Sequence, residues 1–324
     1  MEATRHYPET LVEAIRYFAD PDRALDFMVK LRWPDGVVRC PRCGSDGATF
    51  IASRRLWQCH ERHERRQFTV KVGTIFEDSP LALDKWLAAI WMLANSKNGI
   101  SSYELHRSIG VTQKTAWFML RRIRLAMQDG GTHGGGLSGQ IEVDETFIGG
   151  KARFMHQDKR AAKIKGTGGM GKVAVMGLLD RHGADGHSTV ALKIIPNTRR
   201  STLAAEVRAR VEPASVVFTD ALKSYDDLAD DYIHGVIDHA EKYVEGTVHT
   251  NGLENFWSLL KRAVKGTYVS VEPFHLFRYL DEEATRFNTR RVADGERFHR
   301  VLRTVVGRRL TYKQLTGKEV PLPT

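Results

Sequence analysis

The sequence predicts a multidomain protein of the α+β class, in which small helical and β-like modules precede one larger α/β domain. Three observations carry this prediction. The apolar residues change from helical spacing to strand-like runs partway along the chain. The change occurs at a glycine-rich linker, residues 128–139. Ahead of the linker, three cysteines lie close together in a short β-like segment.

The first predicted module is a helical segment, residues 1–37. Leu11, Ile15 and Phe18 follow one another at spacings of four and three residues, which predicts one apolar stripe on a helix. The polar N-terminus lacks the apolar stretch of a secretory signal. The sequence also lacks a run of 18 apolar residues, which a membrane-spanning helix would need. We therefore expect a cytoplasmic protein without a membrane partner.

The second predicted module is a zinc ribbon, residues 38–72. Cys40 and Cys43 stand three positions apart and are followed by a glycine, as in a zinc knuckle, and Cys59 follows after 15 residues. His63 is the predicted fourth ligand of a structural Zn²⁺, and His60 is a weaker candidate because it directly follows Cys59. The alternative is that the cysteines only pack in a core. Their odd number argues against a disulfide framework.

The third predicted module, residues 83–127, has three helices in the order of a helix-turn-helix. Gly110 is the predicted C-cap of the second helix, and Thr112 is the predicted N-cap of the third, which is basic and amphipathic. On a DNA-reading helix the first side chains face base edges and later arginines contact phosphates. These residues would be Gln113, Lys114 and Thr115 at the helix start, then Arg121, Arg122 and Arg124. An ordinary three-helix packing unit with a basic face is an equal alternative.

Residues 140–292 are predicted to form the α/β domain. Apolar, β-branched runs between turn residues predict its strands, and helical spacing predicts the helices. The expected order is strands at 140–148, 172–180 and 188–195, a helix at 199–211, a strand at 214–218, a helix at 221–229, a strand at 232–236 and a helix from Leu253. Three antiparallel strands followed by alternating elements is the order of a ribonuclease-H-like fold. Residues 293–324 are expected to form a basic C-terminal tail.

Three carboxylates stand where this fold would bring them together. Asp144 lies on the first strand, Asp220 follows the fourth, and Glu254 lies in the first turn of the last helix. Carboxylate oxygens suit Mg²⁺, and two such ions can stabilise the attacking and the leaving oxygen of a phosphodiester. We therefore predict two catalytic Mg²⁺ or Mn²⁺ ions at these acids. Each acid alone is more often structural, so the prediction depends on the combination.

Residues near the three acids give further candidates. Lys261 follows Glu254 by two helical turns and could contact a phosphate, although a solvated lysine or an ion pair is the alternative. Asn251, one turn before Glu254, is an alternative third ligand. Glu145 is left out of the metal site because neighbouring strand residues point to opposite faces. His249 could contact DNA or a carboxylate near the metal.

The formal net charge of +10 favours a polyanionic partner. Positive charge gathers between residues 151 and 172, where the alternative is a solvated loop. We expect double-stranded DNA to contact Lys151, Arg153, Arg262 and Lys265 in the second half of the chain. A solvated basic face and phosphate contacts are equal alternatives for the arginines nearer the C-terminus, which are Arg286, Arg290, Arg291, Arg297, Arg300, Arg303, Arg308 and Arg309.

With these residues in place, the chain resembles bacterial insertion-sequence transposases of the Asp-Asp-Glu type. The subgroup has a zinc ribbon, a helix-turn-helix and a ribonuclease-H-like catalytic domain. The matching stretches span most of residues 38–292 and include CPRCG, GISSYELHRSIGVTQKTAWFMLRRIR, EVDETFIGG, FTDALKSY and HTNGLENFWSLLKRAVKGTY. The sequence departs from the family in the ribbon, where the segment from Cys59 to His63 replaces a second CxxC.

The resemblance implies that Asp144, Asp220 and Glu254 bind the catalytic metal ions, with Lys261 beside them. Some family members have an asparagine in the third position, so Asn251 stays an alternative. The implied activity is cleavage at terminal inverted repeats and transfer of the freed strand to target DNA. By analogy it requires a homodimer or a larger synaptic assembly, acting at the nucleoid.

Two other functions are compatible with such a fold. One is a domesticated, non-catalytic DNA-binding regulator, against which the presence of all three acids argues. The other is a stand-alone ribonuclease-H-like nuclease, which would not need the two N-terminal modules. Strand joining separates a transposase from a nuclease.

Overall fold

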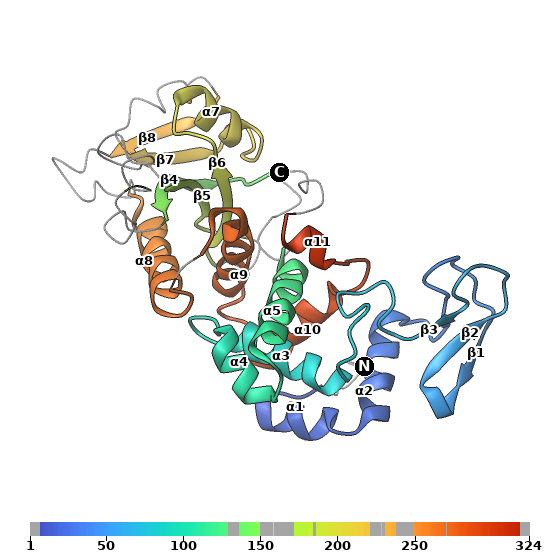
Figure 1. Ribbon diagram of the computed structural model, residues 1–324. Coiled ribbons are helices and arrows are strands. Elements are labelled where there is room, and N and C mark those ends of the chain that lie inside the picture. Colours follow the sequence, from blue (N-terminus) through green and yellow to red (C-terminus); the bar gives the residue numbers. More distant parts are fainter. Residues whose placement is uncertain are drawn as a thin grey trace. The chain divides into compact units, whose positions relative to one another are not determined.

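The computed structural model divides the chain into two compact units (Figure 1). One unit combines residues 1–127 with 291–324, and the other is the continuous stretch 128–290. The structure describes residues 7–128, 136–149, 158, 172–183, 186–220, 228, 231–237, 249–269 and 271–317. The boundary after residue 127 agrees with the position of the glycine-rich linker.

The first unit consists of helices around one apolar core, with a small sheet. Its helices are α1 (Leu11–Phe18), α2 (Pro21–Arg32), α3 (Leu83–Asn95), α4 (Ser102–Ile109), α5 (Gln113–Met127), α10 (Asp294–Arg303) and α11 (Tyr312–Leu315). The antiparallel sheet has the order β1 (Ala48–Ile51), β2 (Leu56–Cys59), β3 (Gln67–Phe68). The central helix is α3, which packs on α1, α5 and α10 and buries Trp86, Leu87 and Ile90.

Local signals in the sequence set where these helices begin and end. Thr10 and Ser101 form capping boxes with Glu13 and Glu104, so that side chains satisfy the first free amides of α1 and α4. Gly110 ends α4 in the left-handed conformation, at φ +62°, as predicted for a C-cap glycine. The predicted N-cap of α5 is also confirmed, because the backbone amide of Thr115 donates to Oγ1 of Thr112 at 3.1 Å.

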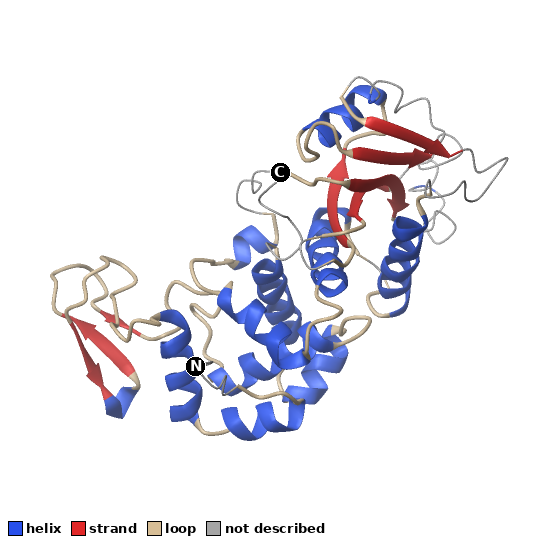
Figure 2. Cartoon of the chain, turned by 180° about the vertical axis from the view of Figure 1, so that it is seen from behind, coloured by secondary structure: helices blue, strands red, loops and turns tan. Residues whose placement is uncertain are grey.

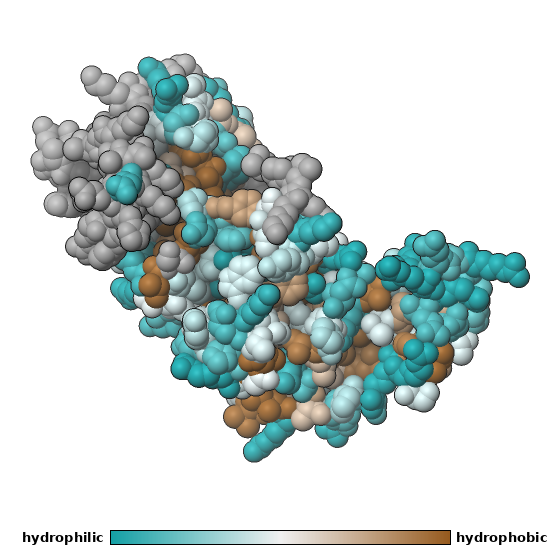
Figure 3. Space-filling view, in the orientation of Figure 1, coloured by the Kyte–Doolittle hydropathy of each residue, from teal (hydrophilic) through white to brown (hydrophobic). Residues whose placement is uncertain are grey.

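Of the three residues in the apolar stripe predicted for α1, Phe18 is the one that is buried. Leu11 is 37% exposed and Ile15 is 53% exposed, whereas Ala14 and Phe18 are buried. Ala14 and Phe18 are four residues apart and share a face, and the small Ala14 side chain lets α1 approach α3 closely. The exposed residues form an apolar patch over α1 that is visible in the space-filling view (Figure 3).

The prediction of a separate C-terminal tail was wrong. Phe298, Val301 and Leu302 of α10 are buried in the core of the first unit. The ring of Phe298 lies 4.9 Å from that of Trp91 and 5.9 Å from that of Phe18, between centroids. The helix therefore belongs to the N-terminal core, because its apolar face completes the packing around α3.

The second unit is built on a five-stranded mixed sheet. The order is β6 (Thr189–Ile195), β5 (Val173–Asp180), β4 (Gln140–Ile148), β7 (Val216–Asp220), β8 (Ile233–Ile237). In this unit, β4, β5 and β6 pair in antiparallel fashion, whereas β7 pairs in parallel with β4 and β8 pairs in parallel with β7. These strands confirm the predicted ones to within two residues at each end. The helix predicted at 221–229 lies outside the described residues, except for Leu228.

Helices cover both faces of this sheet (Figure 2). On one face α7 (Arg200–Arg208) packs Leu203 and Val207 against Ile141 and Val143 of β4. The other face is covered by α8 (Asn251–Gly266) and α9 (Leu276–Asn288). Because successive strand residues point to opposite faces, Ile141 and Val143 face α7, whereas Glu142, Asp144 and Ile148 face α8. Among the described helices of both units, none is long and apolar enough to span a membrane.

Candidate functional site

The end of β4 and one face of α8 border an open cavity of about 620 Å³. Asp144 lines it from β4, and Glu254 and Lys261 line it from α8. Glu254 and Lys261 are two helical turns apart, so they lie on one face of the helix. Asn251 is exposed and is not among the described residues that border the cavity. This arrangement favours Glu254 over Asn251 as the partner of Asp144.

The backbone of Asp220 lies beside that of Asp144. The parallel pairing of β4 with β7 ends at Val143 and Thr219, and Asp144 and Asp220 are the next residues of these two strands. The side chain of Asp220 lies outside the described part of the chain. The register therefore brings together the backbone positions of the two aspartates, which follow from different parts of the sequence.

Glu145 lines the cavity too, although strict alternation predicted that it would point away. Among the described residues, the pairing of β4 with β7 ends at Val143, and the pairs from Asp144 onward are with β5. The side chains of Asp144 and Glu145 follow the end of that pairing and border the same open space. Glu145 therefore borders the cavity of Asp144, and its exclusion from the metal site stays a prediction.

Two hydrogen bonds fix the carboxylate of Asp144. Nε1 of Trp257 donates to Oδ2 at 2.8 Å, and the backbone amide of Glu145 donates to Oδ1 at 2.8 Å. Trp257 reaches Asp144 because Gly177 lies opposite Asp144 on β5, where a Cβ atom would come within 2.7 Å of the indole ring. No pattern in the sequence singles out Trp257 as a donor; the glycine inside an otherwise apolar strand indicates only that another group approaches closely there.

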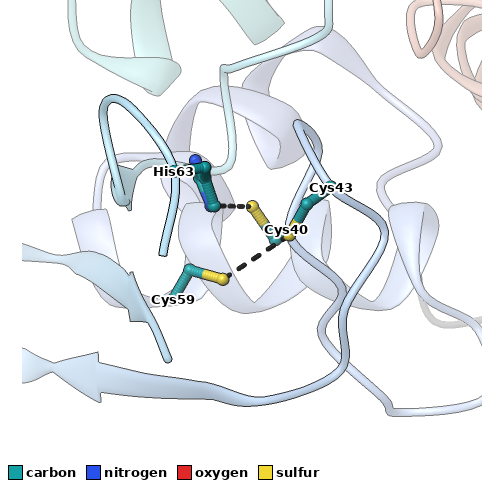
Figure 4. Close-up of side chains that lie close together, drawn as sticks. All are labelled: Cys40, Cys43, Cys59 and His63. Atoms are coloured by element: carbon teal, nitrogen blue, oxygen red, sulfur yellow. Dashed lines mark hydrogen bonds between the residues drawn. The ribbon is translucent and has the colours of Figure 1, made fainter. Parts of the chain in front are cut away.

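Three cysteines and one histidine form a separate cluster in the first unit (Figure 4). One ligand atom from each of Cys40, Cys43, Cys59 and His63 lies within 4.8 Å of all the others. Sγ of Cys43 is 3.7 Å from Sγ of Cys59, and Sγ of Cys40 is 3.5 Å from Nε2 of His63. Ligands of a tetrahedral Zn²⁺ stand roughly 3.5 to 3.8 Å apart. The cluster therefore fits zinc, and His63 supplies the fourth ligand.

The surroundings of the cluster orient its ligands. Nδ1 of His63 donates to the carbonyl of Glu64 at 2.7 Å, which leaves Nε2 free to bind metal. His60 instead bonds to Oγ1 of Thr49 at 2.8 Å. Burial opposes ionisation of Cys40, but hydrogen bonds from the backbone amides of Arg42 and Cys43 and from neighbouring thiols lower its pKa to about 7. Cys40 can thus be a thiolate near neutral pH, the form that binds Zn²⁺.

Comparisons with known proteins match both sites. The model of the ISXO2-like transposase domain matches residues 136–288, and that of the transposase zinc-ribbon domain matches residues 20–63. A transposase-like protein of Haemophilus influenzae is 34% identical over 96 residues, 29% of this chain and 77% of that protein. A protein in transposable element ISH50 of Halobacterium salinarum is 30% identical over 258 residues, 76% of this chain and 84% of that protein. The chain belongs to the ISXO2-like transposase family.

In this ISXO2-like transposase, the first residues of α5 include one exposed side chain and two that form hydrogen bonds within the protein. Lys114 is exposed, with Nζ 5.8 Å from the ring centroid of Tyr312. Nε2 of Gln113 donates to Oγ of Ser102 at 2.8 Å. The hydroxyls of Thr115 and Thr112 lie 2.8 Å apart. Among the three predicted base-reading residues, Lys114 can therefore reach a ligand without breaking a hydrogen bond such as those of Gln113 and Thr115.

The phosphate contacts expected for Arg121, Arg122 and Arg124 were wrong, because these side chains are only 4%, 4% and 2% exposed. Nη1 of Arg122 donates to the carbonyls of Ile75 and Glu77, at 2.9 and 2.6 Å, and the guanidinium stacks over Phe118. Burial lowers the pKa of Arg122 to about 10. Arg122 thus binds the segment before α3 to α5.

The other basic candidates of the transposase have different surroundings. Arg262 and Lys265 are exposed and line the cavity of Asp144, whereas Lys151 and Arg153 lie outside the described residues. Most of the C-terminal arginines contact protein groups. Arg286 pairs with Glu282 and Glu283, Arg290 bonds to Ser188, Arg297 pairs with Asp294, Arg300 with Glu296 and Arg309 with Asp78, and Arg308 bonds to the carbonyl of Leu125.

Proposed function

We propose that this transposase cleaves DNA at the ends of its insertion sequence and joins the freed strands to target DNA. The observation that carries the proposal is the cavity shared by Asp144, Glu254 and Lys261, beside the backbone of Asp220. Asp144 and Glu254 come from elements more than 100 residues apart in the sequence. Acids that converge in this way on open space suit hard divalent cations.

We infer that the second unit has a ribonuclease-H-like fold. The sheet order β6-β5-β4-β7-β8, with three antiparallel strands followed by two parallel ones, supports this. In such a sheet the first and fourth strands in chain order are neighbours, as β4 and β7 are here. The fold thereby accounts for the convergence of acids that are distant in the sequence.

Asp144, Asp220 and Glu254 would hold two divalent ions, Mg²⁺ or Mn²⁺. Bound there, the ions supply Lewis-acid stabilisation of the attacking and the leaving oxygen of a phosphodiester. The residues of the chain then have distinct tasks. Trp257 and the amide of Glu145 keep the Asp144 carboxylate in one orientation, and Lys261 offers a positive charge to a phosphate in the cavity.

A row of polar and basic side chains leads from the acids along α8. Ser258, Lys261, Arg262 and Lys265 all line the cavity, at spacings that place them on one helical face with Glu254. We propose that this row binds the phosphates of the DNA strand near its scissile bond. Lys151 and Arg153 would extend the same contact.

We infer that α4 and α5 form a helix-turn-helix that reads the terminal inverted repeats. The support is the left-handed Gly110 between the helices, the N-cap at Thr112 and the exposed Lys114 at the start of α5. Gln113 and Thr115 would join Lys114 at base edges after exchanging their present partners. Joining two ends requires two copies, so we propose a homodimer or larger synaptic assembly at the nucleoid.

The test is cleavage and strand transfer on DNA that carries the ends of the element, with Mg²⁺ or with EDTA. We expect wild-type protein to cleave and join only with the metal. The variants Asp220→Ala and Glu254→Ala should lose at least 1,000-fold in rate, on the order of what single groups contribute in preorganised active sites, and still bind the ends.

The matched controls are two neighbouring asparagines of α8. Asn255→Ala changes an exposed residue that does not line the cavity among the described residues, so its activity should stay near that of wild type. If Asn251→Ala abolishes activity and Glu254→Ala does not, the third ligand is Asn251. Metal-dependent cleavage without joining would support a nuclease instead, and binding without any chemistry would support a regulator.

A further inference from the structure

A second acid of β4, Glu142, lies two residues before Asp144 and is only 1% exposed. Residues two apart on a strand point to the same face, so Glu142 and Asp144 both face α8. Burying a carboxylate without partners would cost on the order of several kcal/mol. The partners of Glu142 therefore indicate its role. The cavity that contains Asp144 does not include Glu142 among its described lining residues.

One oxygen of Glu142 caps the first turn of α8. Its Oε2 accepts from the backbone amide of Leu253 at 2.9 Å, which is one of the free amides at the helix start. Within the described residues, the N-cap side chain, Thr250, does not make this bond. Gly252 permits the close approach, since a Cβ atom there would lie 2.8 Å from Oε2. A carboxylate at a helix N-terminus also interacts favourably with the helix dipole.

The other oxygen of Glu142 pairs with Arg181, which follows β5. Nε of Arg181 lies 2.8 Å from Oε1, and both side chains are at most 10% exposed. Nη2 of Arg181 donates to Nδ1 of His249 at 2.9 Å, in the segment that leads into α8. The guanidinium lies over Phe218 of β7, 4.1 Å from the ring centroid. Glu142, Arg181 and His249, here called the Glu142 network, thus connect three strands to the entry of α8.

The two carboxylates of β4 bind α8 at two points. Glu142 accepts from Leu253 and Asp144 accepts from Trp257. A separation of two residues along a strand spans about 6.8 Å, and a separation of four residues along a helix, as from Leu253 to Trp257, rises about 6 Å. The spacings match, so both bonds form in only one register of α8 along β4. Glu254 follows the first donor directly, and this register therefore decides where its carboxylate stands relative to Asp144.

We propose that Glu142 is a positioning residue, which holds the first turn of α8 through the Glu142 network so that Glu254 and Asp144 bind metal together. The inference rests on the proposed function, because it assigns the metal to these two acids. It adds that an acid outside the cavity sets the metal affinity of those inside it.

The test uses full-length Glu142→Gln. Glutamine can still accept from Leu253 but loses the charge that holds Arg181. We expect retained folding by circular dichroism and retained binding of the element ends. Direct Mn²⁺ binding and the Mn²⁺ concentration for half-maximal cleavage should weaken by roughly 10- to 100-fold, the usual effect of losing a residue that orients a metal ligand. High Mn²⁺ should restore much of the rate.

The matched control is Glu206→Gln, which removes another paired acid from the same unit, on α7 at the opposite face of the sheet. Its metal dependence should equal that of wild type. If Glu142→Gln lowers the melting temperature but leaves the Mn²⁺ dependence within about twofold of wild type, Glu142 only stabilises the fold, and this inference alone fails. If wild-type protein neither binds Mn²⁺ nor cleaves DNA, the proposed function fails, and this inference fails with it.

Discussion

At the scale of single residues, the site depends on a donor that no motif describes. Trp257 is buried, yet its one polar atom is directed at Asp144 rather than at solvent. A tryptophan on the apolar face of an amphipathic helix predicts packing, and packing accounts for most of the contacts of Trp257. Its contact with Asp144 could not be predicted, because it depends on Gly177 lying opposite Asp144 across two strands.

This contact gives a prediction for Trp257→Phe. Phenylalanine keeps the apolar ring but removes the donor to Asp144, so one carboxylate oxygen loses its fixed orientation. We expect the rate of strand transfer to fall by roughly 10- to 100-fold and the melting temperature to change little. The measurement is the single-turnover rate across a range of Mn²⁺ concentrations. Trp91→Phe, a change of the same kind in the first unit, is the control, and equal rates for both variants would contradict the role of Trp257.

Glu145 and Arg122 show how strictly local rules can fail. Alternation along β4 predicted that the side chain of Glu145 would point away from the cavity of Asp144. This rule applies to a strand that is paired on both sides, but among the described residues the pairing of β4 with β7 ends at Val143. The helical pattern of α5 was predicted correctly, but positive charge was read as exposure. Arg122 can be buried because its guanidinium donates hydrogen bonds to two backbone carbonyls and stacks over an aromatic ring. The two carbonyls, those of Ile75 and Glu77, come from a distant segment, which the sequence of α5 alone does not reveal.

At the scale of elements, the zinc ribbon was the easiest to predict, because its ligands follow one another in the sequence. The knuckle closes locally: the amide of Gly44 donates to the carbonyl of Cys40 at 2.9 Å, and Gly44 has a φ of +78°. The second arm is held by Arg66, which donates to the carbonyls of Cys59 and His60. The choice between His60 and His63 needed the structure, since either could be placed near Cys59 by spacing alone.

Metal removal tests this element. We expect a strong chelator to unfold the ribbon, because a sheet of three short strands has little core of its own. Acid should have the same effect, because protons compete with zinc for its ligands: the pKa of Cys40 is about 7, and burial raises that of Cys59 to about 11. The measurement is zinc release, followed by a chromogenic indicator between pH 8 and 5.

His63→Ala is the variant for this experiment, and His60→Ala is its control. The first should release zinc at a higher pH than wild type, and the second should behave as wild type because His60 bonds to Thr49 instead. Equal release from both variants would show that His63 is not the fourth ligand.

At the scale of the whole molecule, the chain order and the arrangement in units differ. The second unit is one continuous stretch, and its five strands, α7 and α8 follow the order predicted from sequence patterns, whereas α9 was not predicted. The first unit is discontinuous, because residues from 291 onward join a core formed by the first 127. A basic, polar-looking segment at the end of a sequence predicts a tail. The contacts of Phe298 with Phe18 and Trp91, together with the burial of Val301 and Leu302, reveal that α10 belongs to the N-terminal core.

This discontinuity leads to a prediction for Phe298→Ala. Phe298 is 0% exposed, so truncation leaves a cavity beside α3, and the free energy of unfolding of the first unit should fall by roughly 3 to 5 kcal/mol. Phe274→Ala is the matched control, since Phe274 is 49% exposed in the second unit and should lose less than about 1 kcal/mol. Urea unfolding, followed by tryptophan fluorescence, measures both. If Phe298→Ala also weakens binding of the element ends, the C-terminal helix supports DNA recognition by holding α3 and α5 in place. Unchanged stability would contradict the role of Phe298 in this core.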